Sequence, residues 1–329
     1  MIIVRSPLRI SLGGGGTDLP AWYEQHGAAL VTAAIDKYIY FTGADRWFDR
    51  NIWLSYSRVE ICSRVDEVQN ELLRCCLAKY RLPNGVEMHS LSEVPGSSGL
   101  GSSGAFLVGA LTLLNAMEQR AMAVCDVAEL ACSIEMKELR RSSGKQDQYA
   151  SACGGIQFLE IDRNGHVTAT ALAPDAQFTR ALNANLLLYY TGVRRDAEDI
   201  LREQAGQMGA KARTATEAMH EIQAIGLQSK DCILSGDLDT FGRLLHRHWD
   251  VKKSISGKMS VPAIDAIYDF AILQGALGGK LMGAGGGGFF MFYVPLAKQD
   301  IFRRAMVDRG LAEMSWRFDP FGCRVVFAS

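Results

Sequence analysis

The residues from Pro95 to Gly104 carry the strongest chemical pattern in this chain, because glycine or serine occupies eight of the ten positions. Val86 to Val94 before them has the length and residue mix of a strand, and the apolar residues after them recur at helical spacing. The run therefore sits where a helix begins, and the first amides of a helix have no partner within it. Glycine lets a ligand approach those amides, and the helix dipole favours an anion there. Serine hydroxyls add donors, and one could ligate magnesium, so the pattern predicts a nucleoside triphosphate loop.

Two other interpretations of this run remain open on the sequence alone. One is a flexible loop that ends in a serine N-cap. The other is a dinucleotide-binding turn, because Gly99, Gly101 and Gly104 have the Gly-x-Gly-x-x-Gly spacing between a strand and a helix. The preceding strand mixes polar and apolar residues and a proline interrupts the turn, which argues against that second interpretation. The Gly-Lys-Ser/Thr ending of a P-loop does not occur.

A second glycine-rich stretch lies near the N-terminus, at residues 13–18. Arg9 precedes it inside an expected strand, which is an unusual place for a charge. The four glycines permit a turn closed to larger residues, and Asp18 could accept hydrogen bonds from neighbouring sugar hydroxyls. The alternative is that Thr17 or Asp18 caps the helix that follows.

A third candidate for chemistry is Asp147, in the polar turn of residues 142–151. Beside Lys145, this carboxylate could act as a general base that the cation holds ionised. It could equally be an acid at a helix N-terminus that interacts with the dipole.

His246 and His248 are two residues apart, which places them on different faces of a helix. We therefore expect solvated polar positions there and not a metal pair.

Composition limits the classes of function. The chain has 329 residues, a formal net charge of −1, 48% hydrophobic and 22% charged residues, which describes an ordinary globular protein large enough for two domains. No global charge attracts it to nucleic acid or to an anionic membrane, and no apolar run is long enough to span a bilayer. The eight cysteines are scattered, with no Cys-x-x-Cys pair. We expect a cytoplasmic protein without a nucleic-acid or membrane partner and without a zinc site.

The pattern of expected elements mixes helices and strands. We expect separate strands at residues 2–4 and 8–12 with Pro7 between them, and two paired strands within 28–44. A helix is expected over 124–139, where apolar residues recur at helical spacing. These elements must position the candidate residues described above.

The pattern loosens near residues 172–182, so we place a boundary there, between domains 1–175 and 176–329. The second half contains a third glycine-rich run at 278–288. That run precedes a strand, whereas the turn of a dinucleotide-binding fold precedes a helix. Because ordering so many glycines costs conformational entropy, we infer that the backbone there approaches a ligand or the other domain.

Taken in order along the chain, these stretches resemble the GHMP small-molecule kinases. The resemblance rests on a glycine-rich turn with aspartate near the N-terminus, a Pro-x-x-x-Gly-Leu-Gly-Ser-Ser loop, a Gly-x-Gln-Asp-Gln turn and a Gly-Ala-Gly-Gly-Gly run near the C-terminus. It covers nearly the whole chain. The sequences Gly-Gly-Gly-Thr-Asp and Gln-Asp-Gln-Tyr-Ala are similar to the sugar 1-kinase branch, with the D-glycero-D-manno-heptose 7-phosphate kinases nearest and L-fucose kinase next.

The resemblance implies a two-domain α+β fold, with a ribosomal-protein-like N-terminal domain, a ferredoxin-like C-terminal domain and the site in the cleft between them. It implies a kinase that uses ATP and Mg²⁺ to phosphorylate the anomeric hydroxyl of a small sugar. The expected substrate is D-glycero-D-manno-heptose 7-phosphate, and its 1,7-bisphosphate would feed the synthesis of nucleotide-activated heptose for polysaccharide. A kinase for L-fucose or another hexose, an NAD-dependent oxidoreductase and an inactive homologue remain as alternatives. The oligomeric state stays open.

The resemblance also implies roles residue by residue. Asp147 matches the catalytic aspartate, and Arg9 matches a basic residue that stabilises developing charge. Ser103 matches the magnesium-binding serine, and Glu135 matches its acidic partner. The resemblance places the sugar at the N-terminal glycine-rich stretch, on Gly15, Gly16, Thr17 and Asp18. It places the ATP phosphates at the glycine-serine run, on Gly96, Ser97, Ser98, Gly99, Leu100, Gly101, Ser102, Ser103 and Gly104.

Two departures from the family pattern stand out, one at a helix start and one in a turn. Gly104 stands where alanine is usual, which we interpret as a minor change at a helix start. Lys145 and the basic residues 140–141 replace a more neutral turn. We hypothesise that added charge at Lys145 and Arg195 holds a phosphate that the sugar already carries. Further candidates for this role are Arg194, Lys252 and Lys253.

Overall fold

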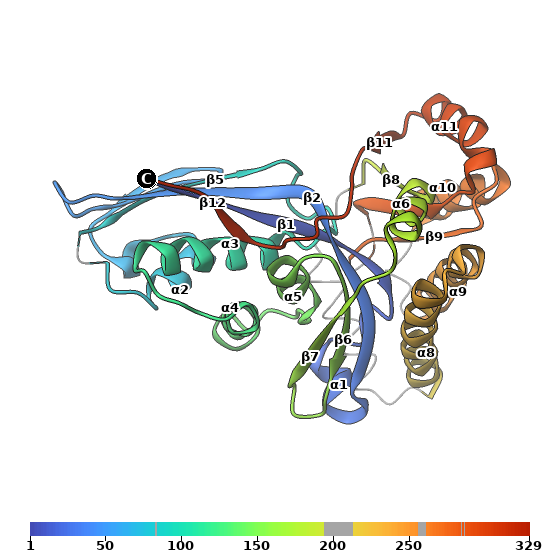
Figure 1. Cartoon of the computed structure of the whole chain (residues 1–329), viewed down its shortest axis with the longest axis horizontal. Coiled ribbons are helices and arrows are strands. Elements are labelled where there is room, and N and C mark those ends of the chain that lie inside the picture. The colour runs from blue at the N-terminus through green and yellow to red at the C-terminus, as the bar shows by residue number, and fades with distance from the viewer. Residues whose placement is uncertain (83, 194–212, 256–260, 284, 286) are drawn as a thin grey trace.

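The structure is a computed structural model, and it describes residues 1–82, 84–193, 213–255, 261–283, 285 and 287–329. The chain forms an eight-stranded sheet and a four-stranded sheet (Figure 1). Among the described residues, no helix combines the length and apolar character that a membrane crossing requires. The strands of the larger sheet are β1 (Ile2–Gly13), β2 (Ala28–Asp45), β3 (Ile52–Ser55), β4 (Val59–Cys62), β5 (Val86–Ser92), β6 (Ile156–Ile161), β7 (Val167–Leu172) and β12 (Arg324–Ala328).

Strands β1 and β2 form the long central pair of the larger sheet, and both differ from the expectation. Residues 2–4 and 8–12 belong to one strand, and the two strands expected within 28–44 are also one. The register between β1 and β2 shifts between Pro7 and Leu8, so a bulge interrupts the pairing there. A proline and a bulge break the alternation of the sequence without ending the strand, which explains the error. β2 pairs with β5 along its C-terminal half and with β6 along its N-terminal half.

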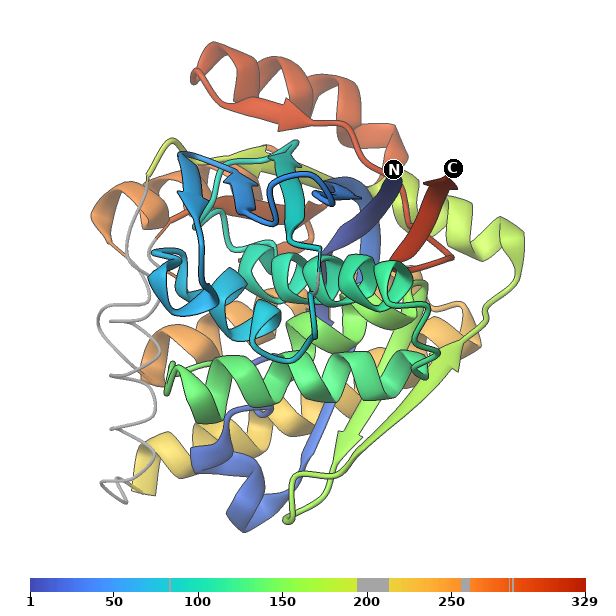
Figure 2. The same ribbon diagram turned by 90° about the vertical axis from the view of Figure 1, so that its left-hand side faces the viewer.

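Helices cover one face of the larger sheet (Figures 1 and 2). Helix α3 (Ser102–Met117) packs against β1 and β2, with Phe106 edge-to-face on Phe41, so the helix expected after the glycine-serine run is confirmed. The helix expected over 124–139 is present, but it ends in a π-helical turn. The other helices of this half are α1 (Pro20–His26), η1 (Val65–Glu67), α2 (Glu71–Leu77), α4 (Val124–Ser133), the π-helical turn η2 (Ile134–Glu138) and α5 (Gln146–Cys153).

The smaller sheet has the order β11-β8-β10-β9 with antiparallel neighbours, and its strands are β8 (Leu186–Tyr190), β9 (Gly278–Leu281), β10 (Phe289–Tyr293) and β11 (Ala312–Met314). Described helices lie between β8 and β9, and a short 3-10 helix and an α-helix lie between β10 and β11. This succession, with the last strand beside the first, is the ferredoxin-like arrangement that the resemblance implied. The helices are α6 (Ala176–Asn185), α8 (Arg213–Ser235), α9 (Leu238–Ile255), α10 (Pro262–Leu273), η3 (Leu296–Lys298) and α11 (Gln299–Asp308).

Several contacts tie the two sheets together. α8 packs on β1 and β2, and one buried apolar cluster contains residues of both halves, such as Leu8 and Phe241. After β11 the chain returns to the larger sheet, where Phe318 bridges to Ile35 and β12 pairs with the start of β1. The division of the chain near residue 175 stays a prediction. These contacts fix the two halves around the pocket described next.

Candidate active site

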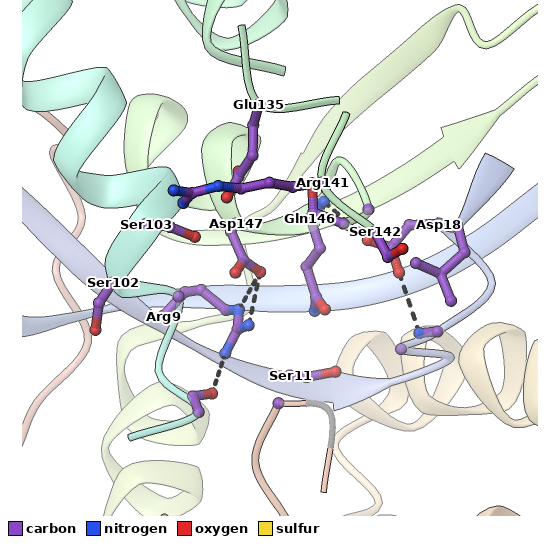
Figure 3. A pocket seen from close by; sticks show the side chains of 18 of the residues that line it. Arg9, Ser11, Asp18, Ser102, Ser103, Glu135, Arg141, Ser142, Gln146 and Asp147 are labelled. Atoms are coloured by element: carbon purple, nitrogen blue, oxygen red, sulfur yellow. Dashed lines mark hydrogen bonds and ion pairs between the residues drawn. The ribbon is translucent and has the colours of Figure 1, made fainter. Parts of the chain in front are cut away.

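A pocket of about 290 Å³ lies between the two halves of the molecule (Figure 3). Its wall includes Arg9 and the glycine turn at residues 13–18, the loop at 97–103 and the turn that ends in Asp147. α9 and β9 complete the wall from the second half. The three stretches that the sequence singled out therefore meet at one place.

The loop before α3 has the geometry of an anion site. Ser97, Gly99 and Gly101 all have positive φ angles, of 56°, 81° and 78°, and alternating left-handed residues turn successive amides to one side. α3 begins after Gly101 without a side-chain cap and without an acidic residue in its first turn. The expected alternative of a serine N-cap is therefore wrong. The hydroxyls of Ser98 and Ser102 are buried with no partner among the described residues, so both remain available to a ligand.

The third glycine-rich run lies directly against this loop. A Cβ at Gly283 would come within 2.7 Å of the Gly99 Cα, and one at Gly288 would collide with the backbone of Ser98. The amide of Phe289 donates to the Ser98 carbonyl at 3.2 Å. The inference that the backbone of this run approaches another part of the molecule is confirmed, because only glycine lets the two loops pack so closely.

Arg9 connects the loop to Asp147. Its Nε and Nη2 donate to Asp147 Oδ1 at 2.7 and 2.6 Å, and its Nη1 donates to the Gly99 carbonyl at 2.5 Å (Figure 3). Its backbone amide also donates to the Leu100 carbonyl. The cation beside Asp147 is therefore Arg9, and the expectation that Lys145 has this role is wrong. No described residue donates to Asp147 Oδ2, which leaves that oxygen free to meet an acceptor hydroxyl.

Gly104 faces the backbone of Asp147. A Cβ at position 104 would lie 2.6 Å from the Asp147 Cβ and 3.0 Å from its carbonyl carbon. The first contact is shorter than real Cβ atoms make and the second is unusually tight, so a side chain at position 104 would require α3 or α5 to shift. Gly104 therefore packs directly against Asp147, and the interpretation of this position as a minor change gave that packing too little weight.

Glu135 lies on the π-helical turn η2 and is 3% exposed. Gln148 Nε2 donates to its carboxylate at 2.6 Å, and the Ser103 hydroxyl hydrogen-bonds to it. Burial raises the pKa of Glu135, the Ser103 and Gln148 hydrogen bonds oppose that rise, and the Asp147 charge adds to it. The carboxylate and hydroxyl oxygens suit Mg²⁺, which binds through one or two carboxylates and otherwise through phosphates and water. In the described part of the chain, no cluster of three or more His, Cys, Asp or Glu residues could hold a metal ion.

Asp18 closes the other side of the pocket. Its two carboxylate oxygens accept the amides of Gly16 at 3.1 Å and Gln146 at 3.0 Å. Burial raises the pKa of Asp18, and the two amide hydrogen bonds oppose that rise. The alternative that Thr17 or Asp18 caps the next helix is wrong, because the N-cap of α1 is Leu19 and no side chain caps it. Asp18 joins the glycine turn to the turn of Asp147.

The structure brings most of the expected residues into the pocket, but not all. Arg195 lies outside the described residues, as does Arg194. Thr17 is buried and hydrogen-bonds within its own turn. The residues in the pocket wall are Arg9, Gly15, Gly16, Asp18, Ser97, Ser98, Gly99, Gly101, Ser102, Ser103, Glu135 and Asp147, and the expected residues outside it are Thr17, Gly96, Leu100, Gly104 and Lys145.

Lys145 does not face the pocket. It is 5% exposed, and its Nζ donates to Glu129 Oε1 and to the Gly165 carbonyl, both at 2.6 Å. Its charge is therefore already neutralised on the far side of α5, and we remove it from the expected sugar-phosphate site. The expectation that His248 is a solvated polar position is also wrong, because this residue is fully buried.

Sequence reasoning gave too little weight to several residues of the pocket wall. Ser11 lies two positions after Arg9 on β1, so the period of a strand places both on one face. Lys280 is a charge inside a strand, the same signal that singled out Arg9, but the glycines around it drew attention away. Lys252 was named only as one of several basic residues. Gln146, beside Asp147, completes this group.

The dinucleotide-binding interpretation is wrong. β5, the strand before the loop, pairs antiparallel with β2 and parallel only with the four-residue strand β3, in a sheet whose other pairs are antiparallel. A dinucleotide-binding turn follows a strand of a parallel sheet.

Comparisons with known proteins agree with this geometry. The family described as GHMP kinases N terminal domain matches residues 66–155, and the one described as GHMP kinases C terminal matches residues 229–311. A D-glycero-alpha-D-manno-heptose 7-phosphate kinase of Campylobacter jejuni is 30% identical over 95% of each chain. An L-fucokinase/L-fucose-1-P guanylyltransferase of Bacteroides fragilis is 28% identical over 87% of this chain and 34% of its own length.

The crystal structure of a D-glycero-D-manno-heptose 1-phosphate kinase from Bacteroides thetaiotaomicron aligns with a TM-score of 0.83 at 25% identity, over 100% of both chains. The two-domain fold implied by the sequence is thereby confirmed. Family models and relatives cover the residues that build the pocket, from the loop before α3 to the smaller sheet. This chain therefore belongs to the GHMP kinases and is an ATP-dependent phosphotransferase that acts on a hydroxyl group.

Proposed function

We propose that this protein transfers the γ-phosphoryl group of ATP to the anomeric hydroxyl of D-glycero-D-manno-heptose 7-phosphate and so forms the 1,7-bisphosphate. The observation that carries the proposal is the position of the Arg9–Asp147 pair, between the phosphate loop and Asp18 in one pocket. A relative named as a heptose 7-phosphate kinase is similar along nearly the whole chain, which supports the choice of sugar.

In this proposal the loop and the start of α3 hold the ATP phosphates. The amides of residues 102–104 point out of the helix, and the unpartnered Ser98 and Ser102 hydroxyls add donors. Ser103 and Glu135 would hold the magnesium ion that accompanies ATP. When bound, that ion neutralises charge on the phosphates.

Asp147 receives the acceptor. Its Oδ2 is the free carboxylate oxygen, so the sugar hydroxyl donates its hydrogen bond there and either gives up its proton or is oriented toward the γ-phosphate. Arg9 fixes Asp147 through Oδ1 and fixes the loop through Gly99, which holds the donor and acceptor groups in one geometry. Asp18 takes the remaining sugar hydroxyls, since each of its oxygens keeps a lone pair.

We place this reaction in the cytoplasm, where ATP is available. All eight cysteines are free thiols in the structure, which suits a reducing compartment.

The test is an assay of ADP release over a panel of heptose 7-phosphate, free heptose, mannose, L-fucose and galactose. We expect the highest kcat/KM with heptose 7-phosphate, and a new phosphorus resonance of a phosphate on carbon 1. A higher kcat/KM with L-fucose would show that the substrate is L-fucose and not heptose 7-phosphate. Absence of ADP release with every sugar would contradict the proposed sugar kinase activity.

A further inference from the structure

Two buried lysines face the pocket from the second half of the molecule. Lys252 on α9 is 4% exposed and Lys280 on β9 is 1% exposed. Their ammonium groups reach only neutral acceptors, the Gly283 carbonyl at 2.7 Å and the Ser11 hydroxyl at 3.2 Å. No carboxylate of the described residues forms an ion pair with either lysine. A buried charge without a counter-charge is costly, so a fold that keeps two of them side by side is suited to an anion from outside.

Among the described residues, the surroundings of the two lysines contain no carboxylate in contact with them, and the charge of Asp18 acts on them from across the pocket. His248 lies one helical turn before Lys252 on α9, fully buried, and neither ring nitrogen has a partner among the described residues. Burial, with the charges of Lys280 and Lys252, holds the pKa of His248 well below its usual value, so this ring stays neutral. Burial likewise lowers the pKa of Lys252, to about 8, and lowers the pKa of Lys280 well below its usual value, and the Arg9 charge adds to both effects. The charge of Asp18 opposes the shifts of the two lysines, and a bound anion would oppose them further.

The contacts of Lys280 place it on the sugar side of the pocket. Its Nζ donates to the Ser11 hydroxyl, and a Cβ at Gly15 would collide with that same oxygen, so Lys280 adjoins the glycine turn that carries Asp18. Lys252 lines the same pocket and contacts the Gly283 carbonyl. A phosphate held by Lys280 would therefore lie beside the sugar.

The spacing along β1 fits a phosphorylated sugar. Arg9 contacts Asp147, and Ser11, two residues further along the strand, contacts Lys280. Two residues of a strand span about 7 Å. Asp147 and Lys280 are thus held at two successive positions on one face of β1, so a sugar that presents its anomeric hydroxyl to Asp147 would extend its terminal carbon toward Lys280.

We infer that Lys252 and Lys280, with the Ser11 hydroxyl, form the subsite for a phosphate that the sugar already carries, so the substrate class is aldose monophosphates phosphorylated at the terminal carbon. The inference rests on the proposed function of this pocket. It assigns the role that the sequence gave to Lys145 and Arg195 to a different pair of cations, on the opposite wall.

The experiment compares two substrates, heptose 7-phosphate and free heptose, in wild-type enzyme and in Lys252→Met and Lys280→Met. Each substitution should lower kcat/KM for the phosphorylated sugar about 10- to 100-fold. It should leave kcat/KM for free heptose and KM for ATP within threefold. Lys253→Met is the matched control, because that side chain points to Asp250 and Asp265 and is outside the pocket wall. An equal loss for both sugars, or a raised KM for ATP, would overturn the inference.

A second measurement needs no variant. Phosphite dianion should fill the empty subsite when wild-type enzyme turns over free heptose and should raise kcat/KM for that sugar, because remote binding energy contributes to the rate. No effect of phosphite up to the concentration that inhibits ATP binding would contradict the subsite. Failure of the proposed function would appear separately, as absence of ADP release by the wild-type enzyme with every sugar.

Discussion

The two ends of the pocket present charge in different ways. The loop at residues 97–103 offers neutral backbone amides and serine hydroxyls, Glu135 stands beside it, and the cations at this end, Arg9 and Arg141, act on the carboxylates of Asp147 and Glu135. The opposite end holds two buried ammonium groups, Lys252 and Lys280, with no acidic partner among the described residues. ATP brings its own cation, so the cations at this end can be matched by carboxylates, and one carboxylate can help to hold the metal. A sugar phosphate brings no cation, so the protein must supply the positive charge.

The largest effect on kcat is expected at Asp147, which lies between the two ends of the pocket. Asp147→Asn should lower kcat about 10³-fold or more, because the amide no longer accepts the hydroxyl proton and no longer pairs with Arg9. The affinity for ATP should change less than threefold, since the loop and the start of α3 hold the phosphates. Single-turnover kinetics and nucleotide titration measure the two quantities.

The matched control for this variant is Glu160→Gln, which removes an exposed carboxylate from β6. It should leave kcat and ATP affinity unchanged. Retention of a tenth or more of the wild-type kcat by Asp147→Asn would remove this residue from its proposed role.

A smaller effect is expected where α3 touches α5. Gly104→Ala places a methyl group 2.6 Å from the Asp147 Cβ, so the carboxylate must shift away from the acceptor hydroxyl. We expect kcat to fall about 10- to 100-fold, since small displacements of a positioned group cost that much. Steady-state kinetics with both substrates saturating measures the fall.

Gly96→Ala is the control, because a Cβ at position 96 meets nothing within 4 Å. It lies in the same loop, so it tests whether added bulk alone lowers the rate. Equal rates for the two alanine variants would show that Gly104 does not position Asp147.

The pH dependence should distinguish the two ends. The pKa of Lys252 is lowered to about 8 by burial, so the free enzyme loses this positive charge as pH rises through that value. The second pKa of a phosphate monoester is about 6, so the phosphate dianion and the Lys252 ammonium group are both present between pH of about 6 and 8. Above that window, kcat/KM for the sugar phosphate should fall toward tenfold per pH unit.

The same profile measured with free heptose should lack this decline, and so should the profile of Lys252→Met with the sugar phosphate. A decline that persists in the variant would assign the ionisation to another group. The pH dependence would then give no evidence that the charge of Lys252 distinguishes the sugar end from the nucleotide end.

Much of the site was predictable because its residues follow from simple local rules. Glycines before a helix predict an anion site, and the loop at 97–103 has that geometry. A charge inside a strand predicts a functional residue, and Arg9 pairs with Asp147. The fold class followed from the resemblance of these motifs to a known family, and the family matches confirm it.

The errors arose where long-range packing decides the outcome. Lys145 stands two residues from Asp147, and sequence proximity suggested that it faces the same ligand. The start of α5 instead turns it toward Glu129 and Gly165. Lys280 lies 133 positions after Asp147 along the chain, and only the pairing of β9 with β10 and its approach to Ser11 bring it into the pocket. Local rules do not encode such contacts.

The smallest effect on kinetics is expected for Lys145→Met. This variant tests directly whether Lys145, and not Lys252 and Lys280, binds the sugar phosphate. KM for heptose 7-phosphate should stay within twofold of the wild-type value, because this ammonium group faces away from the pocket. The free energy of unfolding should fall by about 1–2 kcal/mol, since the Gly165 carbonyl loses its donor while the half-exposed Glu129 regains water. Urea denaturation measures that loss. A tenfold rise in KM without a change in stability would return Lys145 to the sugar-phosphate site and would weaken the assignment of Lys252 and Lys280.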